Sequence, residues 1–139
     1  MKTLHLTIRT PDQEILDSKE VQEVSLQTEM GPLSIMAHHA SLTGSILFSR
    51  LTVRTQEGEV EYLTRRGTLY VDNHKNQAVI LVLSCEKTTS ISYENIEEYL
   101  GYLESLLNSG EQLSEIKIKY LNQEKLAVEE QVKVMKSEK

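Results

Sequence analysis

The residues with most potential for chemistry are histidines and a cysteine. Two of the four histidines are adjacent, His38 and His39, whereas His5 and His74 lie far from them in the sequence. Adjacent side chains of an extended chain point to opposite faces, so the pair cannot readily bind one metal ion. The chain also has no Cys-x-x-Cys, His-x-x-x-His or His-x-His spacing of the kind that metal sites use. We therefore expect no metal site.

Catalytic nucleophiles are equally poorly supported. Cys85 follows an apolar run and should pack as a small hydrophobic residue, and as the single cysteine it cannot form an internal disulfide. No serine stands in a Gly-x-Ser-x-Gly turn, and the glycines form neither Gly-x-Gly-x-x-Gly nor a phosphate loop that ends in Lys. A hydrolase that relies on His38 or His39 is disfavoured, because no positioned nucleophile or general base pair can be named. We expect a non-catalytic adaptor protein.

Size and charge narrow the class of protein further. The chain has 139 residues and a mass of 15.9 kDa, enough for one ordinary domain or two very small ones. Its net charge of -6 disfavours nucleic acid as a partner, because a phosphate backbone would repel it. The longest apolar run, residues 78–83, is far short of the roughly 20 residues that span a bilayer, and no signal-peptide pattern opens the chain. We expect a protein on the reducing, cytosolic side of a membrane, attached to it only through a partner.

Two segments of different composition follow one another along the chain. Every Arg, Asp and Pro lies before Thr88, whereas the charge of the remaining segment comes from Lys and Glu alone. Val, Ile and Thr dominate the first segment and favour strands, while Lys and Glu favour helices. The change predicts a boundary within residues 86–90 and two domains, residues 1–87 and 88–139.

The first domain has the pattern of short antiparallel strands. Apolar residues alternate with polar ones, as in Leu4, Leu6 and Ile8, which is the strand period. Turn-forming residues separate about eight such runs. The run 78–83 is apolar at every position, which is typical of a central strand that is covered on both faces. The spacing predicts a β-sandwich or a flattened barrel.

The second domain has the period of helices. Ser92 is a predicted N-cap, and Asn108-Ser109-Gly110 should end the first helix. A second, longer helix is predicted from Glu111 to Lys136, with an apolar side that includes Tyr120 and Leu121. The short loop makes the pair an antiparallel hairpin, and the overhang of the longer helix needs another surface. The predicted fold is thus an N-terminal antiparallel β-sandwich followed by a C-terminal antiparallel two-helix hairpin.

One segment of the first domain resembles a known family. Residues 28–42, Thr-Glu-Met-Gly-Pro-Leu-Ser-Ile-Met-Ala-His-His-Ala-Ser-Leu, are similar to Thr-Glu-x-Gly-x-Leu-Gly-Ile-x-Pro-Gly-His-Ala-Pro-Leu of the epsilon subunits of F-type ATP synthases, called delta in mitochondria. The turn Thr10-Pro11-Asp12 and the strand Gly67-x-Leu69-x-Val71 also fit. Order and length of the two domains agree as well, so the resemblance covers the whole chain.

The resemblance implies a mechanical function without catalysis. In this family the sandwich clamps the gamma subunit to the membrane c-ring, so that ring rotation turns the central stalk. The hairpin folds down on the sandwich or extends along gamma towards the alpha and beta subunits, where it inhibits ATP hydrolysis. The resemblance places the following residues at the interface with gamma and the c-ring: Glu29, Met30, Gly31, Pro32, His38, His39, Ala40, Ser41 and Leu42. Four lysines of the second helix would meet an acidic partner segment in the extended state: Lys117, Lys119, Lys125 and Lys133.

Departures from the family pattern are as informative as the matches. Ala37-His38 replaces the usual Pro-Gly, and Pro32 replaces a common Glu, so the loop backbone and the contact with the c-ring are expected to differ. Arg66 stands where the first of two family glycines is common. Some bacterial members bind ATP through Ile/Leu-Asp-x-x-Arg-Ala, but residues 91–96 read Ile-Ser-Tyr-Glu-Asn-Ile. With neither Asp nor Arg to meet the nucleotide, we expect no cofactor.

Two alternatives stay open. By resemblance the location is the cytoplasmic face of a bacterial plasma membrane, with a chloroplast thylakoid as the alternative. The alternative function is a stand-alone sandwich that binds a ligand or peptide and uses the hairpin as an oligomerisation arm.

Overall fold

The computed structural model describes residues 2–89, 92–108 and 115–137. The chain forms two compact units, Met1–Ser90 and Ile91–Lys139, and each is described by itself. The first unit contains seven strands: β1 (Leu4–Arg9), β2 (Glu14–Val21), β3 (Glu23–Thr28), β4 (Gly31–Ile35), β5 (Leu42–Thr55), β6 (Gly58–Asp72) and β7 (Gln77–Lys87). The second contains two helices, α1 (Tyr93–Leu107) and α2 (Glu115–Ser137). The predicted β-sandwich and helical hairpin are both confirmed.

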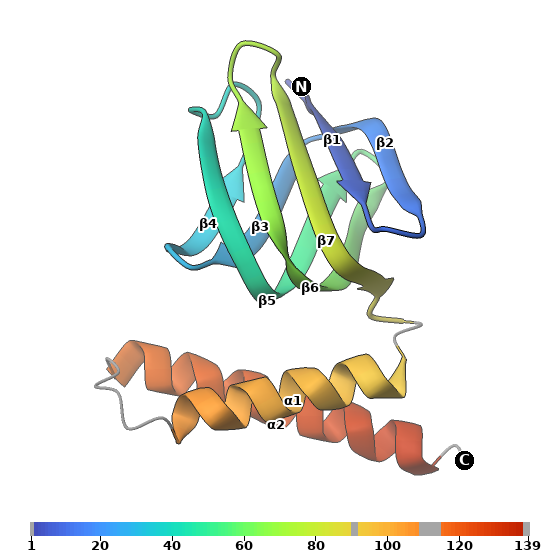
Figure 1. Cartoon of the computed structure of the whole chain (residues 1–139), viewed down its shortest axis with the longest axis vertical. Coiled ribbons are helices and arrows are strands. Elements are labelled where there is room, and N and C mark those ends of the chain that lie inside the picture. The colour runs from blue at the N-terminus through green and yellow to red at the C-terminus, as the bar shows by residue number, and fades with distance from the viewer. Residues whose placement is uncertain (1, 90–91, 109–114, 138–139) are drawn as a thin grey trace. The chain divides into compact units, whose positions relative to one another are not determined.

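The seven strands form one sheet in the order β2-β1-β7-β6-β5-β3-β4. The sheet is folded over into two layers, as Figure 1 shows. Neighbouring strands are antiparallel except β1 and β7, which pair in parallel. The apolar side chains that the alternation predicted to share a face, such as Leu4, Leu6 and Ile8, are buried between the layers.

Two of the strands are much longer than predicted, which is why seven strands replace the expected eight. β5 has 14 residues and β6 has 15. Along β5 the buried positions are Gly44 and Ile46 and then Ser49 and Leu51, so the alternation shifts by one residue midway. This shift lets one long hairpin supply side chains to both layers of the core.

Buried hydroxyl groups stabilise the point at which the alternation shifts. Ser49 and Thr64 are each 1% exposed. The Ser49 hydroxyl accepts a hydrogen bond from the Gln27 amide (2.8 Å), and the Thr64 hydroxyl donates to the Ser49 carbonyl (3.1 Å). Each buried hydroxyl group therefore has a partner, as burial of a polar group requires.

The expectation that β7 is covered on both faces is wrong. Ala78, Ile80 and Val82 are buried, but Leu81 and Leu83 are 42% and 55% exposed. β7 does lie between two other strands, β1 and β6. Its outward side chains, however, meet no covering layer among the described residues. A run that is apolar at every position cannot distinguish a second layer of the same chain from a surface that awaits a partner.

The helical unit is held by one apolar seam. Ser92 caps α1 by accepting a hydrogen bond from the Asn95 amide (3.3 Å), as predicted. The buried side chains of the seam are Ile96, Tyr99, Leu103, Leu121, Val128 and Val132. The Tyr99 hydroxyl donates to the Glu124 carboxylate (3.1 Å) and so links the two helices.

The second helix is longer than the first, as predicted. α2 has 23 residues and α1 has 15, or about 35 and 22 Å at ~1.5 Å per residue. Tyr120, predicted to lie on the apolar side, is instead 39% exposed. The predicted stop at Ser109-Gly110 and the predicted start at Glu111 lie outside the described residues.

Candidate partner-binding surfaces

The β3–β4 turn is the first group of predicted interface residues. Thr28 pairs with Gly31 across the turn, and the Thr28 hydroxyl both donates to the Gly31 carbonyl (3.2 Å) and accepts from the Met30 amide (3.2 Å). Gly31 has φ of +107°, a value that glycine adopts without the steric cost of a side chain. The Met30 side chain is 60% exposed. Glu29 is less available, because its carboxylate accepts a hydrogen bond from the backbone amide of Ser45.

Pro32 follows this turn on β4, at the edge of the sheet. It pairs with Gln27 and is exposed. An edge strand tolerates proline because one side of the strand has no ladder to complete. The replacement of a charged residue by Pro32 therefore leaves a neutral, uncharged edge beside the turn.

The second group of predicted residues forms the loop between β4 and β5. His38, Ala40 and Ser41 are exposed, and His39 and Leu42 are half-buried. The His39 amide donates to the Met36 carbonyl (3.2 Å), and the His39 ring nitrogen Nδ1 lies 2.8 Å from the Ala40 carbonyl. His38 has φ of +62°. At the position where the family pattern has glycine, this loop thus keeps a backbone conformation that glycine adopts readily.

The two predicted groups lie at opposite ends of β4. The turn precedes Gly31 and the loop follows Ile35, so the two are roughly 15 Å apart along the strand at ~3.3 Å per residue. The loop has other neighbours. Asn73 and Asn76 of the β6–β7 turn hydrogen-bond to it, and Figure 1 shows this turn and the N terminus at the same end of the sandwich.

Sequence reasoning missed these neighbours. The residues Asp72-Asn73-His74 were recognisable only as a turn, and His5 lay far from the other histidines in sequence. In the structure the His5 amide donates to the Asn76 carbonyl (3.1 Å), and His74 lies within the turn. Elements that carry all four histidines therefore meet at one end of the sheet.

The outer face of β5, β6 and β7 is a second surface that the sequence did not reveal. Register places two rows across these strands: Ser45, Thr68 and Leu81; Thr43, Tyr70 and Val79. Leu47, Arg66 and Leu83 each lie two residues from the first row, along β5, β6 and β7 respectively. We call these nine residues the apolar outer face. Its large apolar side chains are 42–55% exposed: Leu47, Tyr70, Leu81 and Leu83. Adjacent exposed leucines of this kind usually mark a binding surface, whereas single ones do not.

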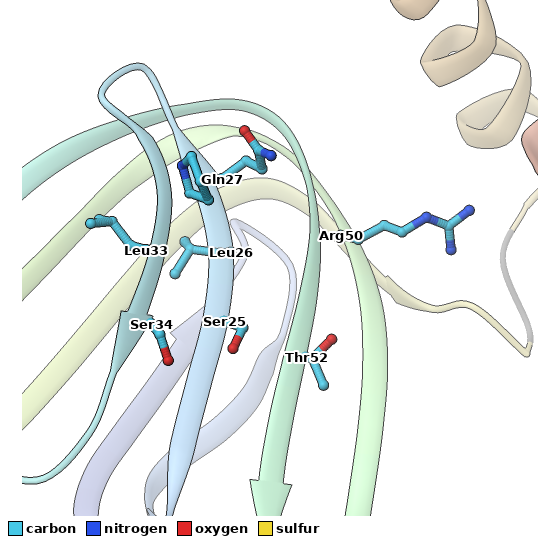
Figure 2. Close-up of a pocket in the computed structure, with 8 residues that line it drawn as sticks. Ser25, Leu26, Gln27, Leu33, Ser34, Arg50 and Thr52 are labelled. Carbon is cyan, nitrogen blue, oxygen red and sulfur yellow. The ribbon is translucent and has the colours of Figure 1, made fainter. Parts of the chain in front are cut away.

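The outer face of β3, β4 and the second half of β5 is polar by contrast. It holds a shallow groove of about 360 Å³ lined by Ser25, Leu26, Gln27, Pro32, Leu33, Ser34, Arg50 and Thr52. Figure 2 shows the Arg50 side chain extending away from the other lining residues. Its guanidinium pairs with Glu61 at 2.8 Å. The groove is open, and its lining combines hydroxyl and amide side chains with the apolar Leu26, Pro32 and Leu33.

The candidate nucleophile is Cys85, and the potential metal ligands are the His, Cys, Asp and Glu side chains of the described residues. Burial, together with the nearby Glu86 carboxylate, raises the pKa of the Cys85 thiol to about 12. The thiol is therefore protonated near neutral pH and a poor nucleophile. Within residues 2–89, 92–108 and 115–137, no group of three or more His, Cys, Asp or Glu side chains is placed to hold a metal ion. Neither described helix is long and apolar enough to span a bilayer.

The four lysines proposed for the regulatory helix do not share one face. Lys117, Lys119 and Lys133 are exposed, while Lys125 is half-buried and lies 3.7 Å from the Glu129 carboxylate. At about 100° per residue, Lys119 and Lys133 lie within ~40° of one another on the outward side of α2. These two lysines therefore share one exposed side of α2.

Comparison with known proteins gives the family. The sequence profile described as "ATP synthase, Delta/Epsilon chain, beta-sandwich domain" matches residues 3–88. The chain belongs to the ATP synthase delta/epsilon family. Its relatives include the chloroplast ATP synthase epsilon chains of Amborella trichopoda and Medicago sativa, each 30% identical, and of Arabidopsis thaliana, 28% identical. Each alignment covers 78% of this chain and 78–80% of the relative.

Solved structures of this fold come from mitochondrial ATP synthases. A chain of the Euglena gracilis enzyme, in a structure that includes the c-ring, has a TM-score of 0.65 at 18% identity and covers 91% of this chain and 81% of that one. A chain of the Tetrahymena thermophila central stalk and c-ring has a TM-score of 0.55 at 18% identity, with 96% and 98% covered.

Proposed function

We propose that the protein is a non-catalytic central-stalk subunit of an F-type ATP synthase, which couples rotation of the c-ring to the gamma subunit. The observation that carries the proposal is the family match across the whole sandwich, residues 3–88. The fold shared with chains of two mitochondrial ATP synthases supports it. A stalk subunit transmits torque through contact surfaces, so it needs large rigid interfaces and no reactive site.

The apolar outer face is the surface that we assign to the gamma subunit. Leu47, Tyr70, Leu81 and Leu83 together expose apolar area that a solvated sheet would not need. Tyr70 offers a large ring with a polar tip, a side chain favoured in binding sites. Arg66, exposed two residues before Thr68 on β6, can add a charged contact at one end of this face.

The loop of residues 36–41 is the surface that we assign to the junction of gamma and the c-ring. Its predicted contacts are His38, His39, Ala40, Ser41 and the adjoining Leu42. The turn at Glu29, Met30, Gly31 and Pro32 lies elsewhere on the same sandwich, so it is assigned as a separate contact. Two contacts on different parts of the rigid sandwich can resist both its rotation and its tilting relative to the partners.

The hairpin is assigned a regulatory role, inhibition of ATP hydrolysis by extension towards the alpha and beta subunits. One apolar seam holds α1 on α2. Leu126 and Val134 on α2 remain 63% and 56% exposed. At about 100° per residue Leu126 lies between Lys119 and Lys133 on the helix surface. Such a mixed face suits an acidic, partly apolar partner. A free-energy difference of only a few kcal/mol between two packing arrangements is enough for the hairpin to switch from one surface to another.

The test is reconstitution of the whole ATP synthase with this chain, with a chain ending at residue 87, or with none. We expect the full chain to co-purify with gamma, alpha and beta, and the truncated chain to bind while ATP hydrolysis rises. Lys119→Glu with Lys133→Glu should raise hydrolysis in the same direction. Lys19→Glu is the matched control, because Lys19 is exposed on the edge strand β2, and it should leave hydrolysis unchanged.

Other outcomes separate the parts of the proposal. Binding without any change in hydrolysis would keep the coupling role and remove the inhibitory one. Failure of the full chain to bind any motor subunit would remove both and favour a stand-alone ligand- or peptide-binding sandwich with a helical oligomerisation arm. In that case the polar groove beside Arg50 would be the first place to seek a ligand.

Cofactor and location follow from the same proposal. ATP binding by the hairpin is not expected, and calorimetry with ATP should give no saturable heat at micromolar concentrations. The protein lies on the membrane surface that carries its complex, without a spanning helix among the described residues. The chloroplast epsilon chains among its relatives support a thylakoid, and the cytoplasmic face of a bacterial plasma membrane is the other location.

A further inference from the structure

The loop that carries His38 is held by side chains from a distant part of the sequence. The His38 amide donates to Oδ1 of Asn76 (2.8 Å), and the His38 carbonyl accepts from Nδ2 of Asn73 (3.1 Å). Two asparagine side chains thus bond both backbone groups of one residue, as a neighbouring strand would. The backbone amide of Asn73 also donates to the Ser41 hydroxyl (2.8 Å). The turn therefore holds the loop at two points, His38 and Ser41.

Asn76 connects a third segment to the same place. Its Nδ2 donates to the Thr3 carbonyl (2.7 Å), and its own carbonyl accepts from the His5 amide (3.1 Å). Asn76 therefore joins the start of β1, the β4–β5 loop and the β6–β7 turn. In the sequence, Thr3 is 73 residues and His38 is 38 residues away from Asn76.

Both central residues of this arrangement have left-handed backbones. His38 has φ of +62° and Asn76 has φ of +51°. Asparagine and histidine adopt this conformation more readily than most residues with a side chain, although it remains uncommon for both. Backbone conformations of this kind persist only where surrounding contacts hold them, and they gather at functional sites.

We propose that Asn73 and Asn76 are positioning residues that present the loop of residues 36–41 to its partner. The β6–β7 turn and the loop then form one surface that is already ordered before the partner binds. Preorganisation raises affinity because the ordering of the loop does not have to accompany binding. This inference rests on the proposed function for the identity of the partner, but not for the hydrogen bonds themselves.

Four variants separate backbone conformation from side-chain bonding. Asn76→Gly keeps the positive φ but removes both side-chain bonds. Asn76→Asp keeps the acceptor for the His38 amide and loses only the donor to Thr3. Asn73→Ala removes the bond to the His38 carbonyl. Lys75→Ala is the matched control, because Lys75 is exposed in the same turn and only its backbone amide bonds there, to Asp72 (3.2 Å).

Two measurements are made on each variant: amide hydrogen exchange in the isolated chain, and affinity for the gamma subunit and c-ring complex. We expect Asn76→Gly to speed exchange at the His38 amide by about tenfold or more, with Leu69 and Ile80 of the core still protected. Its affinity should fall about tenfold, as should that of Asn73→Ala. Asn76→Asp should retain protection of His38 and most of the affinity, and Lys75→Ala should match the unmodified chain.

Each contrary result is decisive. Unchanged exchange at His38 in Asn76→Gly would show that the asparagines do not hold the loop. Faster exchange with unchanged affinity would show that the held loop is not presented to the partner. If Asn76→Gly also exposes Leu69 and Ile80, it has unfolded and Asn73→Ala decides the question. If the unmodified chain does not bind the complex at all, the proposed function fails, while exchange at His38 still decides whether the asparagines position the loop.

Discussion

Two outer faces of the same sheet differ sharply in what they present to solvent. The apolar outer face of β5, β6 and β7 exposes Leu47, Leu81 and Leu83. The polar outer face of β3, β4 and the second half of β5 presents Ser25, Ser34 and similar side chains. Both belong to one continuous sheet over one core, so the difference does not come from backbone structure.

Ion pairs reinforce the contrast. Arg50 and Arg54 pair with Glu61 at 2.8 Å and with Glu23 at 3.3 Å on the polar side. Exposed ion pairs contribute little to stability, at most about 1 kcal/mol each, but they keep a surface soluble. The inward residues of the strands determine the fold, whereas the outward residues determine whether a face is suited to contact with solvent or with a partner. In this chain one outer face is suited to each.

The largest expected effect comes from a glycine beneath the apolar outer face. A Cβ added at Gly67 would lie 2.0 Å from the Leu81 carbonyl oxygen and 2.7 Å from the Val82 Cα. Gly67→Ala must therefore force β6 and β7 apart, at a cost of about 3 kcal/mol or more. Urea unfolding followed by circular dichroism measures this cost.

The control is alanine at another glycine of the sheet, Gly44, which is buried. A Cβ at Gly44 would lie 3.4 Å from Thr28 Cγ2, an ordinary contact, so Gly44→Ala should cost no more than about 1 kcal/mol. Equal costs for the two variants would mean that the close approach of β6 and β7 is not what requires Gly67.

A charge on the apolar outer face should separate binding from folding. Leu81→Lys places an ammonium group at a position that is 42% exposed, so the stability of the free chain should change by less than about 1 kcal/mol. Affinity for the gamma subunit should fall about a hundredfold, because the charge would be buried without a partner in the complex. Titration of the isolated subunits by calorimetry measures both the affinity and its loss.

Ser34→Lys makes the same change on the polar outer face. Ser34 is exposed, and its hydroxyl donates to Glu23 (2.5 Å), so a lysine there has a carboxylate nearby. We expect affinity within about twofold of the unmodified chain. A larger loss from Ser34→Lys than from Leu81→Lys would reverse the assignment of the two faces.

Local patterns in the sequence predicted the parts of this molecule that depend on neighbours in the chain. The alternation in β1, the turn at Thr10-Pro11-Asp12 and the cap at Ser92 all follow from residues within a few positions of one another. The parallel pairing of β1 with β7 could not be predicted in this way, because it joins residues about 70 positions apart.

The surfaces were the least predictable part for the same reason. The apolar run of β7 reveals that its outward side chains are apolar, but not whether they are covered or exposed. Asn73 and Asn76 read as ordinary turn residues until the fold brings His38 beside them. The resemblance placed the loop at an interface, yet only the structure joins it to the β6–β7 turn.

The smallest expected effect concerns Arg66, the one cation of the apolar outer face. Arg66 has φ of +49° within β6, a conformation that costs a residue with a side chain about 1–2 kcal/mol. Glycine avoids this cost but loses about 0.5–1 kcal/mol through the greater freedom of its unfolded chain. Arg66→Gly should therefore raise the free energy of unfolding by about 0.5 kcal/mol, or the melting temperature by ~2–4 °C.

Thr68→Gly is the control with the opposite sign. Thr68 lies in the first row of the same face and has no positive φ, so glycine there should destabilise the chain by about 1 kcal/mol. If Arg66→Gly destabilises as much, the left-handed backbone is not a source of strain. If it stabilises the chain but weakens binding to gamma, the strain is retained because Arg66 takes part in the interface, and the apolar outer face then recognises a partner with a carboxylate or carbonyl group opposite Arg66.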